Sequence, residues 1–219
     1  MSAEKALYKI LVDKIEQDTL VLPILPEIAL KVRQKASEPD VSLNQLSQII
    51  THDASLSLDM LKLANSAAFG GVVKLKSVQQ AVARLGLETI KTLVTAIAVK
   101  HVFHSDNANI TKYSHRLWIE TIDLASVAIS LLSLYLKEHK QCRLTLDSLT
   151  LIALIQNVGV LPILDEAAHH EKLFAHRKFL SHVIEDLASE IGMRIVQAWE
   201  LPEEYCDIVG NWKDMMFLP

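Results

Sequence analysis

The sequence predicts an all-α protein of two packed helical bundles, and three observations lead to this fold class. Apolar residues recur three and four positions apart through most of the chain, as at Leu56, Met60 and Leu63, which is the period of an amphipathic helix. No segment alternates apolar and polar residues between turn signals as a strand would. Half of the 219 residues are hydrophobic, with only six glycines and six prolines, so the chain can bury a substantial core.

Helix starts are predicted by residues that cap free backbone N–H groups. Pro26 suits a first helical position, Asp53 can cap the helix that follows it, and Ser42 with Gln45 has the spacing of a capping box, as does the segment 77–80. Breaks rich in Gly, Pro, Ser, Asp or Asn interrupt the pattern at 38–40, 69–71 and 104–109. The helices are therefore expected near 3–17, 26–37, 42–51, 53–66, 77–85, 87–104, 111–139, 145–157, 162–175, 176–197 and 203–214.

The polar stretch 104–110 is the candidate boundary between the two bundles. It separates an N-terminal helical bundle over 1–104 from a second bundle over 110–219. Both parts are rich enough in apolar residues that we expect them to pack tightly rather than to be freely tethered.

Composition argues against several classes of function. The net charge is −4, and neither half has the basic excess of a nucleic-acid-binding surface, so Lys74, Lys76, Arg84 and Lys91 are interpreted as a solvated face. No apolar run is a convincing membrane span of about 20 residues. The first 20 residues alternate charged and apolar positions, unlike a signal peptide. We expect a cytoplasmic protein whose two cysteines, Cys142 and Cys206, are reduced thiols.

Three polar residues near one predicted helix have ready structural roles. Asp53, which follows His52, is expected to accept hydrogen bonds at the helix start rather than to bind a metal. Asn65 and Ser66 end the same helix. We expect Asn65 to close the helix and to anchor the loop that follows, and asparagine tolerates the left-handed backbone conformation that often ends a helix. On that interpretation Asn65→Ala costs on the order of 1–2 kcal/mol. A ligand contact at Asn65 is the alternative.

Histidines in the second half offer a candidate metal site. Glu166, His169 and His170 lie three and four positions apart on one predicted helix, a spacing that can present a carboxylate and imidazoles to one ion. His176 and His182 follow at wider intervals and point in other directions. A solvated polar face is the favoured interpretation.

Several short motifs together resemble the HDOD family, the HD-related output domain of bacterial signalling proteins. In the front half, over 22–100, they are Leu22-Pro23-Ile24-Leu25-Pro26, Asp53-Ala54-Ser55-Leu56, Leu61-Lys62-Leu63-Ala64-Asn65-Ser66-Ala67 and Ser77-Val78-Gln79-Gln80-Ala81 leading into Leu85-Gly86. In the back half they are Leu117-Trp118, Ala125, the segment 154–161 with Gly159, Gly192, and Trp199-Glu200-Leu201-Pro202. The resemblance spans about residues 20–213.

This resemblance implies an all-α protein whose back half is similar to the HD phosphohydrolases, including the HD-GYP enzymes that cleave cyclic di-GMP. In those relatives His and Asp side chains from several helices bind divalent ions that activate water. Family membership alone does not confer that chemistry, so each position has to be compared.

The positions that carry the metal ligands in those enzymes hold other residues here. Glu120 falls where the first His is expected, and Gln156 and Asn157 fall where the His-Asp pair is expected. The later histidines are replaced by Ala188, Asn211 and Trp212. Amides are weak ligands for transition metals and Ala offers none, so the resemblance implies a degenerate pocket without a metal cofactor.

The sequence thus predicts a non-catalytic signalling module that binds a protein partner. Two alternatives stay open: a sensor whose vacated pocket holds a nucleotide, and a metal-dependent phosphohydrolase with a shifted ligand set that includes His115, His169 or His170. We also expect that Gln156→His with Asn157→Asp would not restore activity, because Ala188 would still leave the pocket short of ligands.

Overall fold

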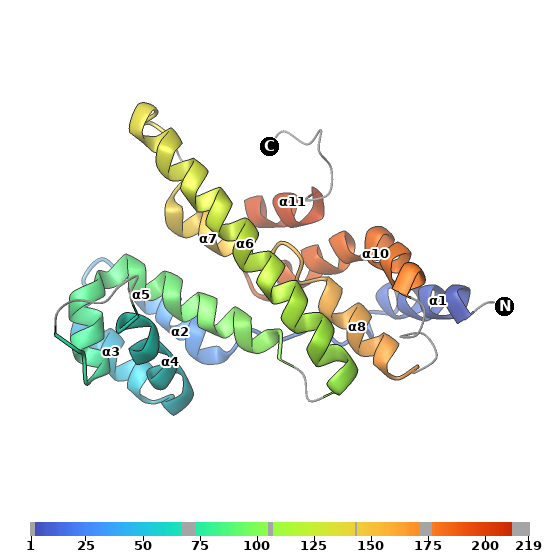
Figure 1. Cartoon of the computed structure of the whole chain (residues 1–219), viewed down its shortest axis with the longest axis horizontal. Helices are drawn as coiled ribbons and strands as arrows, with labels where there is room; N and C mark the ends of the chain where they lie inside the picture. Colours follow the sequence, from blue (N-terminus) through green and yellow to red (C-terminus); the bar gives the residue numbers. More distant parts are fainter. Residues whose placement is uncertain (1–2, 67–72, 105–106, 143, 171–176, 212–219) are drawn as a thin grey trace. The chain divides into compact units, whose positions relative to one another are not determined.

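The computed structural model describes residues 3–66, 73–104, 107–142, 144–170 and 177–211, and in this part of the chain every regular element is a helix (Figure 1). The predicted all-α class is confirmed. The chain forms two compact units. Unit 1 comprises residues 1–24, 103–142 and 152–219, and unit 2 comprises residues 25–102 and 143–151.

Unit 2 is built around one long helix. Helix α5 (Val78–Val102) packs against α2 (Glu27–Ala36), α3 (Leu43–Thr51) and α4 (Ala54–Ala64), and the first turns of α7 (Leu146–Ile155) belong to the same unit. Ile90 and Val94 of α5 are fully buried, as the helical period predicts. Gly86, with φ 78° and ψ 172°, interrupts α5 where two separate helices were predicted, and only glycine adopts this backbone readily.

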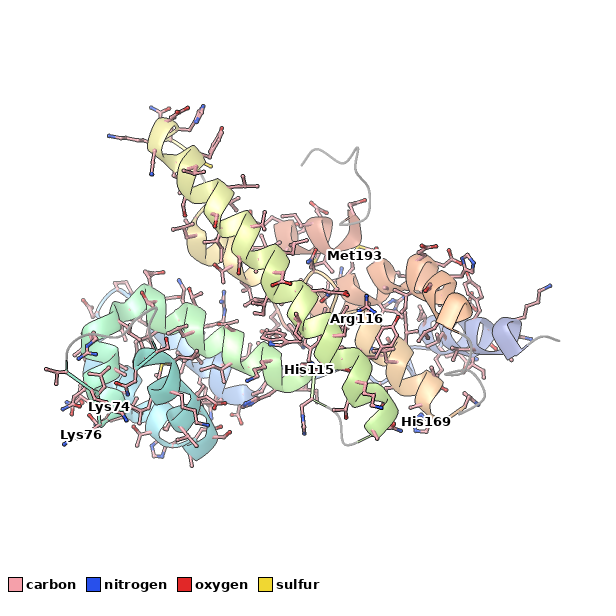
Figure 2. The ribbon with its side chains drawn as sticks, in the orientation of Figure 1. Lys74, Lys76, His115, Arg116, His169 and Met193 are labelled. Carbon is pink, nitrogen blue, oxygen red and sulfur yellow. The ribbon has the colours of Figure 1, made fainter. Side chains whose placement is uncertain are left out.

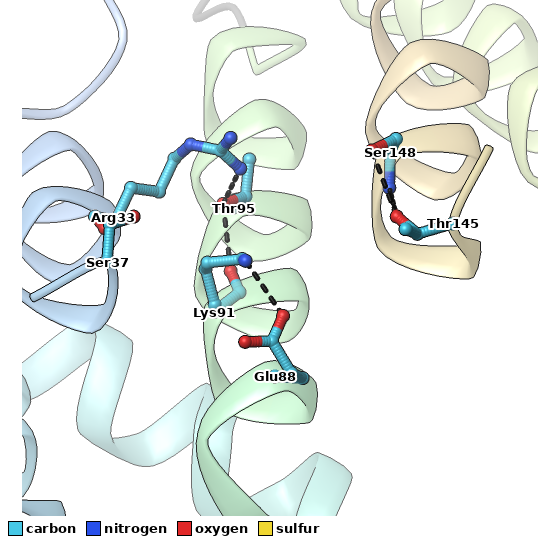
Figure 3. Close-up of polar contacts among 7 residues, drawn as sticks. All are labelled: Arg33, Ser37, Glu88, Lys91, Thr95, Thr145 and Ser148. Carbon is cyan, nitrogen blue, oxygen red and sulfur yellow. Dashed lines mark hydrogen bonds and ion pairs between the residues drawn. The ribbon is translucent and has the colours of Figure 1, made fainter. Parts of the chain in front are cut away.

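Hydrogen bonds fasten the helices of unit 2 to one another and close their ends. Figure 3 shows Arg33 of α2 donating through Nη1 to the Thr95 hydroxyl of α5 at 3.3 Å, and that hydroxyl donating to the Lys91 carbonyl. The same view shows the start of α7, where the Ser148 N–H donates to the Thr145 hydroxyl at 3.0 Å. Thr145 therefore caps α7.

The predicted capping boxes are found with one change. Ser42 and Gln45 exchange both bonds of the box. Ser77 accepts from the Gln80 N–H, but the Gln80 side chain accepts from the N–H of Lys76 instead of Ser77. Helix α2 starts at Glu27, one residue later than Pro26 suggested, because Pro26 is extended at φ −50° and ψ 130°.

Unit 1 contains α1 (Ala3–Glu16), α6 (Ala108–Glu138), the end of α7, α8 (Val160–Ala168), α10 (Arg177–Ala198) and α11 (Glu203–Asn211). Helix α10 contacts α1, α8 and α11, and α6 packs against α8. The Trp199 indole N–H at the end of α10 donates to the Pro23 carbonyl at 2.9 Å, which holds the segment after α1 to this unit.

The units differ from the sequential parts 1–104 and 110–219 in two places. Residues 1–24 belong to the unit that contains most of the second half, because α1 contacts α8 and α10. Residues 143–151 belong to the unit that contains most of the first half. Helix α8 also begins earlier than predicted, at Val160, with Pro162 inside its first turn, where the missing N–H has no intrahelical partner to lose.

Among the described residues, two apolar stretches are long enough to cross a membrane by length and composition alone, although no convincing span was expected from the sequence. They are Ile110–Glu138, in α6, and Ser148–Ala168, in α7 and α8. In the second stretch 67% of the apolar window is buried, as in an ordinary core helix, whereas in the first only 17% is buried. The exposure of α6 is therefore the feature that needs an explanation.

Candidate functional site

The predicted degenerate pocket is represented by Asn157, which lies in the turn between α7 and α8 of unit 1. Asn157 is buried there, and its Nδ2 donates to Oγ1 of Thr121 on α6 at 2.8 Å. The fully buried Thr121 hydroxyl in turn donates to the Leu117 carbonyl at 2.7 Å. Since the hydroxyl proton is used in that bond, Thr121 can only accept from Asn157, which fixes the orientation of the amide.

The other end of the Asn157 amide faces no protein donor in the described part of the chain. Its Oδ1 is buried and makes no hydrogen bond to these residues. An unsatisfied buried acceptor costs about 1–3 kcal/mol, so a water molecule or another small donor is expected to bind there. The site therefore offers one neutral acceptor and no charge.

Glycines bring the backbone of this turn into direct contact with α10. A Cβ at Gly159 would lie 2.0 Å from the Ala188 carbonyl oxygen and 2.5 Å from the Gly192 nitrogen. A Cβ at Gly192 would lie 2.7 Å from Cγ1 of Val209 on α11. A side chain at Gly159 would therefore collide with the backbone of α10, and one at Gly192 with the Val209 side chain, so both close approaches favour glycine.

The structure does not bring Glu120 into this site, which corrects the prediction from the spacing to Trp118. Glu120 is exposed, and its carboxylate accepts from Nε of Arg116 at 2.8 Å on the outer side of α6. Figure 2 shows Arg116 and His115 on the N-terminal part of α6. Because successive residues on a helix point about 100° apart, Thr121 rather than Glu120 faces the turn.

Of the remaining predicted pocket residues that the structure describes, only Gln156 and Ala188 lie near Asn157 or its turn. Gln156 is half-buried beside Asn157, and Ala188 is buried against Gly159. Asn211 ends α11, where its side chain donates to the Asp207 carbonyl at 2.8 Å, a local bond within its own helix. Trp212 lies outside the described residues.

A transition metal does not fit the residues that the structure gathers here. The donors are the Asn157 amide and the Thr121 hydroxyl, both neutral and both weak ligands for zinc, iron or manganese. Over residues 3–66, 73–104, 107–142, 144–170 and 177–211, no three His, Cys, Asp or Glu side chains are grouped to hold one ion.

The histidine cluster of α8 is held by other interactions. Glu166 is mostly buried and forms an ion pair with Lys14 of α1 at 2.5 Å, while His170 lies 3.9 Å from the same carboxylate. His169, the residue after α8, directs Nδ1 to the Asp165 carbonyl of that helix at 2.9 Å, and Figure 2 labels it near the end of α8. His176 lies outside the described residues, and the exposed His182 lies 3.6 Å from Glu185.

Asn65 in unit 2 is a structural anchor, as predicted. Its Nδ2 donates to the Leu61 and Leu75 carbonyls at 2.9 and 3.0 Å, and its Oδ1 accepts from the Leu75 N–H at 2.8 Å. The side chain thus joins the end of α4 to the chain ten residues later. The backbone of Asn65 has φ −99°, so the left-handed conformation considered for it is not used.

The other polar candidates in unit 2 also have local partners. Asp53 caps α4 by accepting from the Leu56 N–H at 2.8 Å, as expected. Ser66 donates its backbone N–H to the Leu63 carbonyl. Of the basic cluster, Arg84 donates to the Val73 carbonyl and Lys91 is paired with Glu88, whereas Lys74 and Lys76 are exposed (Figure 2).

Comparisons with known proteins agree with this fold. The model of the HDOD domain matches residues 22–215. A solved structure from Shewanella amazonensis SB2B, named provisionally as a metal-dependent phosphohydrolase, is 35% identical with a TM-score of 0.86, covering 100% of this chain and 78% of that one. A structure from Marinobacter aquaeolei VT8, named provisionally as a signal transduction protein, is 21% identical with a TM-score of 0.70, covering 99% of this chain and 52% of that one.

A curated relative from Treponema pallidum is called an uncharacterized protein and is 28% identical over 193 residues. The match covers 83% of this chain and 36% of that protein, so the chain spans about a third of the length of this relative. The family match covers most of the chain and includes Asn65, Asn157, Gly159 and Gly192. The chain therefore belongs to the HDOD domain family.

Proposed function

We propose that this chain is a non-catalytic module of bacterial signal transduction that acts by binding a protein partner. The buried bond from Asn157 to Thr121 carries the proposal. The family resemblance matches Asn157 to the Asp of the His-Asp pair in HD enzymes, and here its neutral amide donates to a neutral hydroxyl. Metal-assisted hydrolysis needs ligands that keep a cation in place and activate water, and neither group does this well.

The packing of Gly159 on α10 supports the same proposal. Ala188, at the place of a later histidine, contributes its backbone to that contact and has no donor side chain. A side chain at position 159 would collide with that backbone, since a Cβ there would lie 2.0 Å from the Ala188 carbonyl oxygen, so the turn carries no ligand at Gly159 either. The degenerate site is thus better suited to holding helices together than to holding an ion.

A metal-dependent phosphohydrolase is the second candidate, since the Shewanella relative at 35% identity carries that name. Its ligands would have to come from other residues, such as His115, His169 and His170. The metal content of protein purified without chelator, and hydrolysis of bis-p-nitrophenyl phosphate and cyclic di-GMP with added Mn²⁺, separate the two. We expect far less than one metal per chain and no turnover above the protein-free rate.

Histidine-to-alanine variants of the same chain provide the control for this assay. His115→Ala with His169→Ala and His170→Ala removes the shifted ligand set, whereas His182→Ala removes an exposed histidine of no proposed role. Stoichiometric metal and hydrolysis that are lost in the triple variant and kept in His182→Ala would establish the enzyme instead.

A nucleotide-sensing role is tested in the same preparation. The unpaired Oδ1 of Asn157 could accept from a ligand. A nucleotide present at 100 times its dissociation constant would stabilise the fold by about 2.7 kcal/mol, which a thermal-shift screen detects. We expect no such shift, and we expect pull-down from the native cell to recover a protein partner instead.

A further inference from the structure

Helix α6 exposes a continuous apolar stripe. Five side chains, each 48–62% exposed, form the stripe: Leu124, Val127, Leu131, Leu134 and Tyr135. Their spacing of three, four and three positions places them within about 100° of one another around the helix axis. The stripe is about 16 Å long at 1.5 Å per residue.

A neighbouring face of α6, about 110° around the helix axis from the stripe, is already used within unit 1. Thr121, Ala125 and Leu132 are buried there, and α6 packs against α8. A helix of a globular protein normally keeps polar residues on its outer face, so apolar residues on both faces indicate that the second face is covered as well. Glu120 and Glu138 bound the stripe and give it charged ends, as in the rim of an interface.

The size of the stripe fits an interface between two chains. Its five side chains expose on the order of 500 Å², near the upper limit for an apolar patch on a monomer. Two such stripes in contact, with their flanking residues, bury on the order of 1,000 Å², the area that a specific interface needs. One stripe covering an identical one also satisfies the self-complementarity of a two-fold interface.

We propose that the α6 stripe binds the α6 stripe of a second copy of this chain, with the two helices antiparallel. With the two-fold axis crossing the stripe at the level of residue 129 along the helix, Leu124 meets Leu134 of the other copy and Val127 meets its Leu131, in the alternating order that packs two helices. This arrangement also brings Asp123 of each copy close to Lys137 of the other. A parallel pair would place Glu120 against Glu120 and Glu138 against Glu138.

A membrane fits this helix less well than a second copy does. Although the stretch Ile110–Glu138 is long and apolar enough to span, its outer side also carries Arg116, Glu120 and Asp123. A charged group within a bilayer is costly, and the buried side of α6 is occupied by α8. The proposal goes beyond the proposed function and does not depend on whether the chain is catalytic.

Sedimentation velocity of the full chain between about 1 and 100 µM tests the proposal. We expect a reversible species of twice the 24.5 kDa chain mass. Leu131→Glu places two carboxylates in the centre of the interface and is expected to raise the dissociation constant at least tenfold. The matched control is Leu58→Glu, which makes the same change at a leucine of α4 that is 54% exposed, and it should leave the constant unchanged.

Charge reversal tests the antiparallel direction. Asp123→Lys and Lys137→Asp should each weaken the dimer, and the double variant should restore it, because the pairs are exchanged between copies. A wild-type chain that stays monomeric at about 100 µM would overturn the proposal, as would single reversals without effect. Co-sedimentation of a monomeric chain with phosphatidylcholine–phosphatidylglycerol vesicles, lost in Leu131→Glu, would assign the stripe to a membrane instead.

Discussion

Replacing Asn65 with alanine tests how the end of α4 is held in unit 2. The change removes three hydrogen bonds at once: two donated by Nδ2, to the carbonyls of Leu61 and Leu75, and one accepted by Oδ1 from the Leu75 N–H. Because Leu75 is buried, its backbone groups cannot all recover a bond to water. Leu75 would then lose its hydrogen bonds to the end of α4.

The expected loss in the free energy of unfolding is about 2–4 kcal/mol. Each of the three hydrogen bonds contributes roughly 0.5–1.5 kcal/mol net, and together they account for a loss of this size. This exceeds the 1–2 kcal/mol expected from the sequence alone, because the sequence suggested bonds near the helix end but not the pair of bonds to Leu75. Asn65→Asp should lose about as much, since its carboxylate keeps the bond from the Leu75 N–H but faces two carbonyl oxygens.

Urea unfolding followed by far-ultraviolet circular dichroism measures the effect. Gln48→Ala is the matched control, because it removes an exposed amide side chain from α3 of the same unit and should change the free energy by less than about 0.5 kcal/mol. An Asn65→Ala variant with unchanged unfolding but lost partner binding would refute the reasoning and make Asn65 a binding residue.

Three further predictions concern unit 1. Gly159→Ala should destabilise the fold by more than about 3 kcal/mol or prevent folding, because the added Cβ would collide with backbone atoms. Gly210→Ala should cost much less, because its Cβ would meet only the flexible side chain of Met193 (Figure 2). Equal thermal unfolding midpoints for the two variants would contradict this. Asn157→Asp buries a carboxyl group, and burial raises the pKa of that carboxyl in the folded chain. In urea unfolding, the stability of the variant should therefore be closest to wild type below about pH 4 and should fall as the pH rises toward 7. A difference from wild type that does not depend on pH would contradict this prediction. Burial raises the pKa of the Cys206 thiol, and the nearby carboxylates of Asp207 and Glu203 raise it further. Iodoacetamide at pH 8 should therefore modify Cys206 more slowly in the folded chain than in urea. Equal rates of modification would contradict this.

The positions of helix starts and ends were largely predictable from the sequence. The capping residues Ser42 and Asp53 accept hydrogen bonds from backbone groups three residues later, and Asn65 binds backbone groups up to ten residues away. Such bonds depend on spacing along the chain. Gly86 interrupts α5 for the same reason, since the backbone conformation that it adopts is a property of the residue itself. These features explain why the all-α class and the family resemblance could be inferred before the fold was known.

The direction in which a side chain points was harder to predict. Spacing from Trp118 suggested Glu120 for the site, but a shift of one residue on a helix turns a side chain by about 100°, and Thr121 is the residue that meets Asn157. The buried series Ser114, Thr121 and Ala125 on α6 follows the helical period and could have indicated Thr121.

What the sequence by itself determined about this protein is its local structure: the helices, their caps, the break at Gly86 and the membership of the HDOD family. The tertiary structure alone decided that α1 joins unit 1, that Gly159 meets Ala188 at the backbone, and that the stripe on α6 remains exposed. The physical reason is that capping and helical period involve neighbours along the chain, whereas burial depends on which helix faces cover one another. Apolar spacing shows that a helix has an apolar face, but only packing shows which of two such faces has found its partner.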